Sequence, residues 1–240
     1  MIELRPLASL GTASEAGVEA QFHFSFERYH DPARTNWGRL RAWNAVRFAP
    51  GARTAPHTHH DMEIVTCVHE GAVTYADTEG HSACTGVDEI QVISAGAGIV
   101  HGESNAQATR ARCFEIWILP DRRGGAPTSA RGHFSRGDRA GRLVALASGQ
   151  PCDAGSPALP LRADARVLGA CLEAGRSVTY DIQAARHAYL VATQGRMRVA
   201  DPQTHTTVEA QAGDGVAITG LSSFGVTALE DGEIVLVDTA

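Results

Sequence analysis

The chain has 240 residues, a formal net charge of −6 at pH 7 and 20% charged residues, and all 21 of its basic residues are arginine. Because lysine is absent, Schiff-base, pyridoxal-phosphate and P-loop lysine chemistry are excluded. The acidic balance also argues against direct nucleic-acid binding through a net basic surface.

Length and cysteine content bound the domain count and the compartment. A chain this long can bury a core without disulfides or metal, and it suggests one large or two small domains. Residues 1–5 lack the basic and apolar regions of a signal peptide, and no apolar run of about 18 residues occurs. The cysteine count is odd and no pair has CxxC spacing, which predicts free thiols in a reducing compartment. We therefore expect a cytoplasmic protein without a membrane segment. The five cysteines are Cys67, Cys84, Cys113, Cys152 and Cys171.

Short strand signals dominate the first half of the chain. Runs of β-branched and aromatic residues, separated by Gly and Asp turns, predict strands over 63–68, 72–75, 90–93 and 113–118. Short strands at regular spacing are typical of a sandwich or barrel. Helical periodicity is weak, and only 135–141 is predicted as a short helix.

The second half repeats this layout after a polar stretch at 120–142, which is predicted to be a linker. The turn at Gly71 resembles the turn at Gly195, and the Asp88 turn resembles the Asp214 turn. We therefore predict an all-β protein with two tandem barrels, one in residues 1–130 and one in residues 131–240.

Histidines concentrate in the first predicted barrel, where six of the eleven lie between positions 57 and 101. His57 and His59 form one pair at i and i+2, and His101 and Glu103 form another, so each pair points to one face of a strand. Three imidazoles and one carboxylate can then converge on one point. This donor set suits Fe, Mn, Co, Ni, Cu or Zn, and it lacks the sulfur that structural zinc sites favour. A surface His-x-His pair or satisfied core histidines are the alternative interpretation.

The residues around these pairs resemble the two motifs of the cupin fold and, within it, the pirin family. The first motif runs from Gly51 through the His-x-His pair to Glu63, and the second runs from Gly98 through His101 to Asn105. The clear resemblance covers about residues 24–120, and the second half matches mainly in layout. The resembling segments are residues 26–32, 40–44, 49–51, 57–66, 94–105 and 115–118.

Resemblance to pirin-like proteins implies a bicupin, with two tandem cupin (jelly-roll-like) β-barrels and one divalent metal, usually iron, in the N-terminal barrel. It maps the metal ligands onto His57, His59, His101 and Glu103. Iron(II) is the expected metal, with Mn, Co, Ni, Cu and Zn as alternatives, because imidazole and carboxylate accept many first-row ions.

Two positions depart from the family pattern. Gly102 stands where the family usually has Ser, which removes a side chain and weakens a strand. His60 stands where the family commonly has Arg or Lys, and its parity is opposite to that of His59. We expect His60 to face away from the metal, and a neutral His would supply no fixed charge to steer a substrate.

The second barrel is expected to be structural and to hold no metal. Aligning the glycine and aspartate turns of the two halves places no imidazole at any of the four ligand positions, which fall on Asp181, Gln183, Thr227 and Leu229.

Other polar and aromatic residues near the motifs receive simpler interpretations. Glu63 is interpreted as a structural carboxylate, with a fifth metal ligand as the alternative, and Asn105 is expected to orient a ligand. His69 and His81 are interpreted as surface or turn residues. The tryptophans are expected in the core; they are Trp37, Trp43 and Trp117.

Two functions are consistent with this resemblance. The first is a metal-dependent dioxygenase that cleaves a flavonol such as quercetin, or a similar small aromatic enol, with O₂ and releases carbon monoxide. Glu103 would then be both a ligand and the catalytic base. The alternative is a regulatory binding module of the transcription-cofactor type, in which the redox state of the metal sets a surface for a protein partner.

Overall fold

The computed structural model describes residues 1–183 and 185–240, and strands account for almost all of its regular structure. The described residues contain two short 3₁₀ helices, η1 (Leu7–Ser9) and η2 (Pro151–Asp153), and no helix there has the length and apolarity needed to span a membrane. The predicted strands are confirmed. Residues 136–139 form a turn and Ala140 forms an isolated bridge to Cys171, so the helix predicted over 135–141 is wrong.

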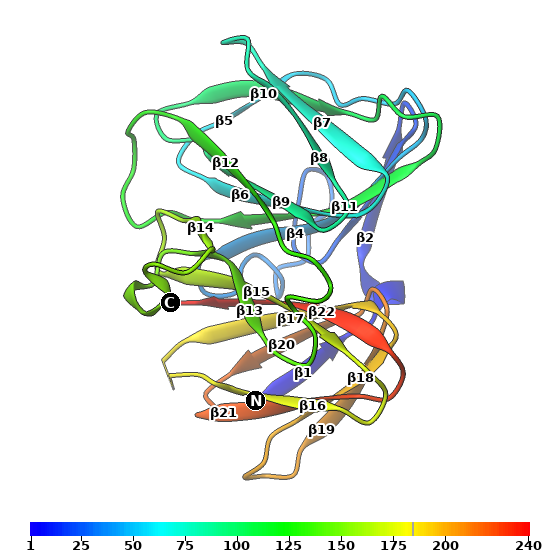
Figure 1. Ribbon diagram of the computed structural model, residues 1–240, viewed down its shortest axis with the longest axis vertical. Coiled ribbons are helices and arrows are strands. Elements are labelled where there is room, and N and C mark those ends of the chain that lie inside the picture. The colour runs from blue at the N-terminus through cyan, green and yellow to red at the C-terminus, as the bar shows by residue number, and fades with distance from the viewer. Residues whose placement is uncertain (184) are drawn as a thin grey trace.

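Two β-barrels of similar build are stacked along the long axis of the molecule (Figure 1). Each combines a seven-stranded sheet with a four-stranded sheet. The sheets of the upper barrel contain β2 (Gly11–Glu15), β3 (Val18–Phe22), β4 (Leu40–Phe48), β5 (His57–His59), β6 (Glu63–Glu70), β7 (Ala72–Asp77), β8 (Ser82–Gly86), β9 (Glu89–Ser94), β10 (Ile99–Ser104), β11 (Ala111–Ile118) and β12 (Thr128–His133). Those of the lower barrel contain β1 (Ile2–Arg5), β13 (Val144–Ser148), β14 (Leu159–Pro160), β15 (Ala165–Leu172), β16 (Ser177–Asp181), β17 (His187–Gln194), β18 (Arg196–Ala200), β19 (Thr207–Gln211), β20 (Gly215–Thr219), β21 (Ser223–Ala228) and β22 (Gly232–Thr239).

The two barrels share one strand order, which supports the predicted internal repeat. The four-stranded sheets run β5-β10-β7-β8 and β16-β21-β18-β19, and the cores of the seven-stranded sheets run β9-β6-β11-β4 and β20-β17-β22-β15. An extra strand covers the equivalent edge in each large sheet: β12 pairs with β9, and the N-terminal strand β1 pairs with β20. Covering an exposed edge in this way prevents pairing with other chains.

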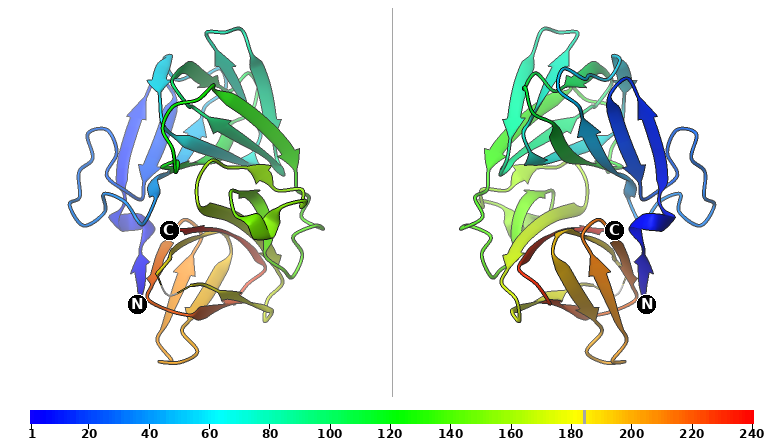
Figure 2. Two further views of the ribbon diagram at one scale, coloured as in Figure 1. Left: turned by 90° about the vertical axis from the view of Figure 1, so that its left-hand side faces the viewer. Right: turned by 90° about the vertical axis from the view of Figure 1, so that its right-hand side faces the viewer.

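Part of the predicted linker is therefore a strand. Strand β12 lies inside 120–142 and spans the position between residues 130 and 131 where the boundary between the halves was predicted. The N-terminal strand β1 lies in the sheet of the second barrel, as the lower barrel in Figure 2 shows. The chain thus crosses from the second barrel to the first after β1, and back to the second after β12.

The main core lies between the two seven-stranded sheets. Their facing sides supply one apolar cluster that includes Trp43, Val65 and Ile116 from the first barrel and Tyr189 and Val235 from the second. Strands packed on both faces should read as nearly continuous apolar runs. Strand β22 is buried at every residue, whereas β10, which faces solvent on one side, alternates between buried and half-buried.

The strand registers correct the alignment of the two halves. His101 lies opposite His57 on one neighbouring strand and opposite Asp77 on the other. In the second barrel the equivalent residue is Phe224. It lies opposite Tyr180, and its chain neighbour Gly225 lies opposite Ala200. The turn alignment had placed the four ligand positions at Asp181, Gln183, Thr227 and Leu229. The strand registers place them instead at Tyr180, Ile182, Phe224 and Val226. All four are buried in the core of the second barrel.

Candidate metal centre

Three histidines of the first barrel lie together on two paired strands. Strand β5 is only three residues long, and its pairing with β10 places His57 opposite His101 and His59 opposite Ile99. The imidazole centroids are 4.7 Å apart between His57 and His59, 4.6 Å between His57 and His101, and 5.0 Å between His59 and His101. One nitrogen of each ring lies within 4.8 Å of the others. The convergence predicted from the i and i+2 pattern is thus present for all three imidazoles.

The hydrogen bonds and pKa values of these rings suit metal binding. His57 Nδ1 lies 2.9 Å from the Ala55 carbonyl and can donate its proton there, which leaves Nε2 as an acceptor. Nε2 of His59 and both ring nitrogens of His101 are buried without a hydrogen-bond partner in the described chain. Burial, followed by the neighbouring imidazoles, lowers the pKa of His59 to about 4 and of His101 to about 3. Neutral rings with free lone pairs are the form that binds a metal.

Glu103 lies on the same face of β10 as His101, but it does not belong to the compact group of the three histidines. It is buried, and its backbone N–H donates to Thr54 Oγ1 at 2.9 Å. Its carboxylate is next to Glu115 on β11. Burial and the Glu103 carboxylate raise the pKa of Glu115 well above its usual range. This pairing favours the protonated form of Glu115. Sequence reasoning missed this carboxyl pair because it joins strands far apart in the chain.

Aromatic side chains surround the three imidazoles. The Trp117 ring lies edge-on to His59 at 4.5 Å and to Phe26 at 4.8 Å, and Tyr75 lies 5.2 Å from His101. Trp43 is fully buried as expected, and the half-buried Trp117 packs against a small core cluster while its ring also borders His59. His57 and His59 are half-buried, so this aromatic-lined end of the barrel is partly exposed to solvent.

Glu63 and His60 lie outside this group. The Glu63 carboxylate accepts hydrogen bonds from Ser94 Oγ at 2.7 Å and from the backbone N–H of Arg162 in the second barrel at 3.0 Å. It therefore joins the barrels, which agrees with the structural interpretation. His60 is 71% exposed, so it faces away from the histidine group as its parity predicted, and it pairs with Asp61.

Asn105 organises loops and does not orient a histidine. Its side-chain amide donates to the carbonyls of Phe48, Ala49 and Thr109, and its Oδ1 accepts from the Gln107 N–H at 2.9 Å. The second-motif asparagine thus fastens the loop after β10 to the end of β4. The expectation that it orients a metal ligand is wrong.

Two family models match the chain. The model "Pirin" matches residues 5–118, and "Quercetinase C-terminal cupin domain" matches residues 146–239. The chain is 45% identical, over the full length of both proteins, to a "Pirin-like protein" of Caulobacter vibrioides. The chain belongs to the pirin family.

Matches from Escherichia coli also cover nearly the full length of this chain. A "Quercetin 2,3-dioxygenase" of Escherichia coli K12 is 29% identical over 99% of this chain and 98% of that protein. The crystal structure of a bacterial pirin from Escherichia coli in complex with nickel(II) superposes with a TM-score of 0.90 at 28% identity, covering 100% of this chain and 99% of that one.

The structure also shows whether a side chain would fit at Gly102 in this pirin. A Cβ atom at Gly102 would meet the Thr54 carbonyl oxygen at 3.4 Å and no closer atom outside its chain neighbours, which is an ordinary contact. The backbone there is regular strand and pairs Gly102 with Ala76. Steric packing therefore does not require glycine at position 102.

Proposed function

We propose that this pirin is a metal-dependent dioxygenase that cleaves the ring of a quercetin-like flavonol with O₂ and releases carbon monoxide. The observation that carries the proposal is the convergence of three imidazoles beside a buried carboxylate and an aromatic wall. The Escherichia coli relative named "Quercetin 2,3-dioxygenase" supports the choice of substrate.

His57, His59, His101 and Glu103 would hold one divalent metal, and we expect iron(II). The donor set is hard to intermediate in character, which suits first-row ions. The buried nitrogens of His59 and His101 without hydrogen-bond partners fit this assignment, because an unsatisfied buried polar atom costs about 1–3 kcal/mol unless a ligand satisfies it. Glu103 completes the set from the same face of β10 as His101.

When bound, the metal would supply Lewis-acid activation of a substrate hydroxyl. Glu103 would take the hydroxyl proton on a carboxylate oxygen, a contribution that is typically worth about 10²–10⁴-fold in rate. In its protonated form, which the raised pKa favours, Glu115 would donate a hydrogen bond to Glu103 and fix the orientation of its carboxylate. Trp117 and Phe26 would bind the flat flavonol rings and exclude water from the reacting face.

Quercetin turnover in air tests the proposal. Protein is reconstituted separately with Fe(II), Mn(II), Ni(II) and Cu(II). With at least one of these metals it should consume the flavonol, seen as a fall in its absorbance, and release carbon monoxide. His101→Ala should lose both metal binding and turnover, whereas the control His60→Ala, which removes the exposed neighbouring histidine, should keep both. Absence of turnover in protein that holds one ion per chain would reject the dioxygenase. A metal-controlled binding module for a protein partner would then become the better hypothesis.

A further inference from the structure

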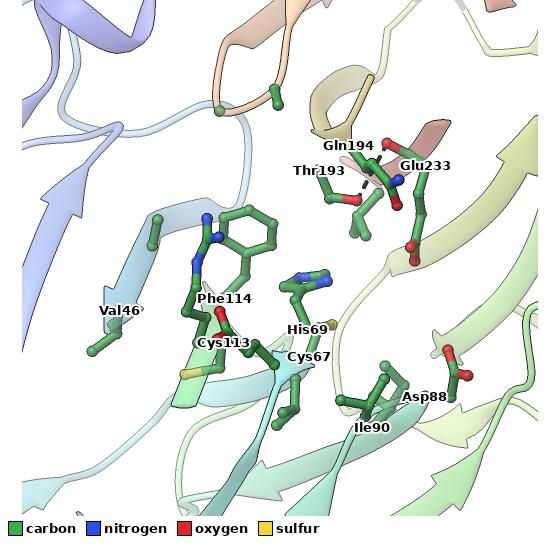
Figure 3. A pocket seen from close by; sticks show the side chains of 18 of the residues that line it. Val46, Cys67, His69, Asp88, Ile90, Cys113, Phe114, Thr193, Gln194 and Glu233 are labelled. Atoms are coloured by element: carbon green, nitrogen blue, oxygen red, sulfur yellow. Dashed lines mark hydrogen bonds between the residues drawn. The ribbon is translucent and has the colours of Figure 1, made fainter. Parts of the chain in front are cut away.

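A cavity lies outside the histidine site, between the two barrels. Its volume is about 390 Å³, within the range of about 300–1,000 Å³ that is typical of small-molecule sites. Strands β4, β6 and β11 line it from the first barrel, and β17 and β22 line it from the second (Figure 3). Phe114 and Cys67, which line it, belong to the core between the barrels. The cavity therefore lies at the outer face of the large sheet, whereas the histidine site lies inside the first barrel.

The cavity has a buried apolar part and an exposed polar part. Its buried lining residues are Cys67, Ile90, Phe114, Leu146 and Val235. Arginine and amide side chains at the surface line the rest, including Arg112, Arg136 and Gln194, with Ala212 exposed beside them. Such a cavity suits a ligand with an apolar body and one charged end.

The acidic residues of the lining are already occupied. Asp88 and Glu233, one from each barrel, both bind the guanidinium of Arg139. Glu70 accepts from Arg110 Nε at 3.1 Å. These carboxylates are neutralised in the folded protein, so they do not repel an anion in the cavity.

Two lining arginines make no side-chain hydrogen bond in the part of the chain that the structure describes. Arg112 on β11 lies directly opposite Arg47 on β4 in the strand register, with Glu70 on the other side of Arg112 and Glu19 on the other side of Arg47. Arg112 makes no ion pair or side-chain hydrogen bond within residues 1–183 and 185–240, and Arg47 reaches only Glu19, at 3.9 Å. Like charges directly opposite each other destabilise a sheet. A bound anion would relieve this repulsion and accept hydrogen bonds from both guanidinium groups.

His69 gives the cavity a buried polar atom without a partner. Its Nε2 is buried and makes no hydrogen bond in the described structure, and its ring lies edge-on to Phe114 at 4.6 Å. In Figure 3 the imidazole projects from β6 towards Thr193 and Glu233 of the second barrel. Burial, followed by the charge of Arg112, lowers the pKa of His69 to about 4. His69 lies within β6 and is half-buried, so its interpretation as a turn residue is wrong.

We propose that the space between the barrels is a binding site for a small aromatic carboxylate. Its ring would lie against Phe114 and the apolar wall, and its carboxylate would bind Arg112 and Arg47. His69 Nε2 would hydrogen-bond to a polar atom of the ligand. A bare inorganic anion would satisfy the arginines but leave the apolar wall uncovered. This site does not depend on the proposed dioxygenase activity.

Isothermal titration of the metal-loaded protein with benzoate tests the site, with benzamide and inorganic phosphate as reference probes. We expect one benzoate per chain, and binding of the neutral amide and of phosphate that is weaker by about tenfold or more, because charge-assisted hydrogen bonds and ring burial are each lost in one probe. Arg112→Gln should weaken benzoate binding by about tenfold or more. Ala212→Trp, which fills the exposed end and leaves every polar group intact, should abolish it.

Two control variants test whether benzoate binds in this cavity and not elsewhere on the protein. Arg176→Gln, an exposed arginine of the second barrel outside the cavity, should bind benzoate like the wild type. His101→Ala should also bind it unchanged, since the cavity is separate from the metal centre. The proposal is overturned if benzoate fails to saturate at millimolar concentration, or if phosphate binds as tightly. It is also overturned if Arg112→Gln and Ala212→Trp bind like the wild type, or if His101→Ala loses binding.

Discussion

A buried histidine between the barrels should make the protein sensitive to acid. His23 is fully buried, and its Nδ1 lies 2.9 Å from the Tyr189 hydroxyl of the second barrel. Burial, followed by the charges of Arg5 and Arg34, lowers the pKa of His23 to about 3. An unfolded histidine takes up a proton below about pH 6.5. Between these two pKa values the unfolded state binds more protons than the folded state. The free energy of unfolding therefore decreases as the pH falls through this range.

The magnitude follows from this difference in protonation. At pH 7.5 both states are neutral at His23, and at pH 5.0 the unfolded state gains about 2 kcal/mol from its proton. The measurement is the free energy of unfolding in urea at the two pH values, for wild type and His23→Gln. The loss of stability between pH 7.5 and pH 5.0 should be about 2 kcal/mol smaller in the variant.

Other buried histidines, such as His69, contribute to the acid sensitivity of both proteins and therefore cancel in this comparison. The exposed His30→Gln serves as a matched control and should retain the wild-type loss. If His23→Gln loses as much stability on acidification as the wild type, the assignment of a neutral His23 in the folded protein is refuted.

Two further predictions concern the junction between the barrels and the second motif. Arg139→Met leaves Asp88 and Glu233 without their shared partner, so guanidinium chloride denaturation should show a loss of about 3 kcal/mol, and an unchanged midpoint would argue against the buried ion pair. Gly102→Ser adds a side chain that meets nothing closer than the Thr54 carbonyl oxygen at 3.4 Å, so the Tm should stay the same or rise by up to about 3 °C. A fall of several degrees in a thermal melt would show that the strand needs glycine there.

Local features of the sequence determined the strands and the histidine cluster. The pleat of a strand fixes the parity of i and i+2 side chains, whatever the rest of the chain does. That parity places His57 and His59 on one face of β5 and turns His60 outward, and the pairing of β5 with β10 then brings His101 opposite His57. The strand signals around the turns depend equally on nearby residues, which is why the layout of both barrels could be predicted.

Register and packing between distant segments decided what the sequence did not. A register slip of an odd number of residues turns every side chain to the opposite face of a strand, so alignment by turn glycines chose Asp181 where the structure has the buried Tyr180.

The carboxyl pair of Glu103 and Glu115, the strand β1 in the second barrel and the cavity at His69 likewise depend on contacts between segments far apart in the chain. No local pattern encodes such contacts. They are fixed only when the two large sheets pack against each other, because burial then selects one arrangement of all their facing side chains.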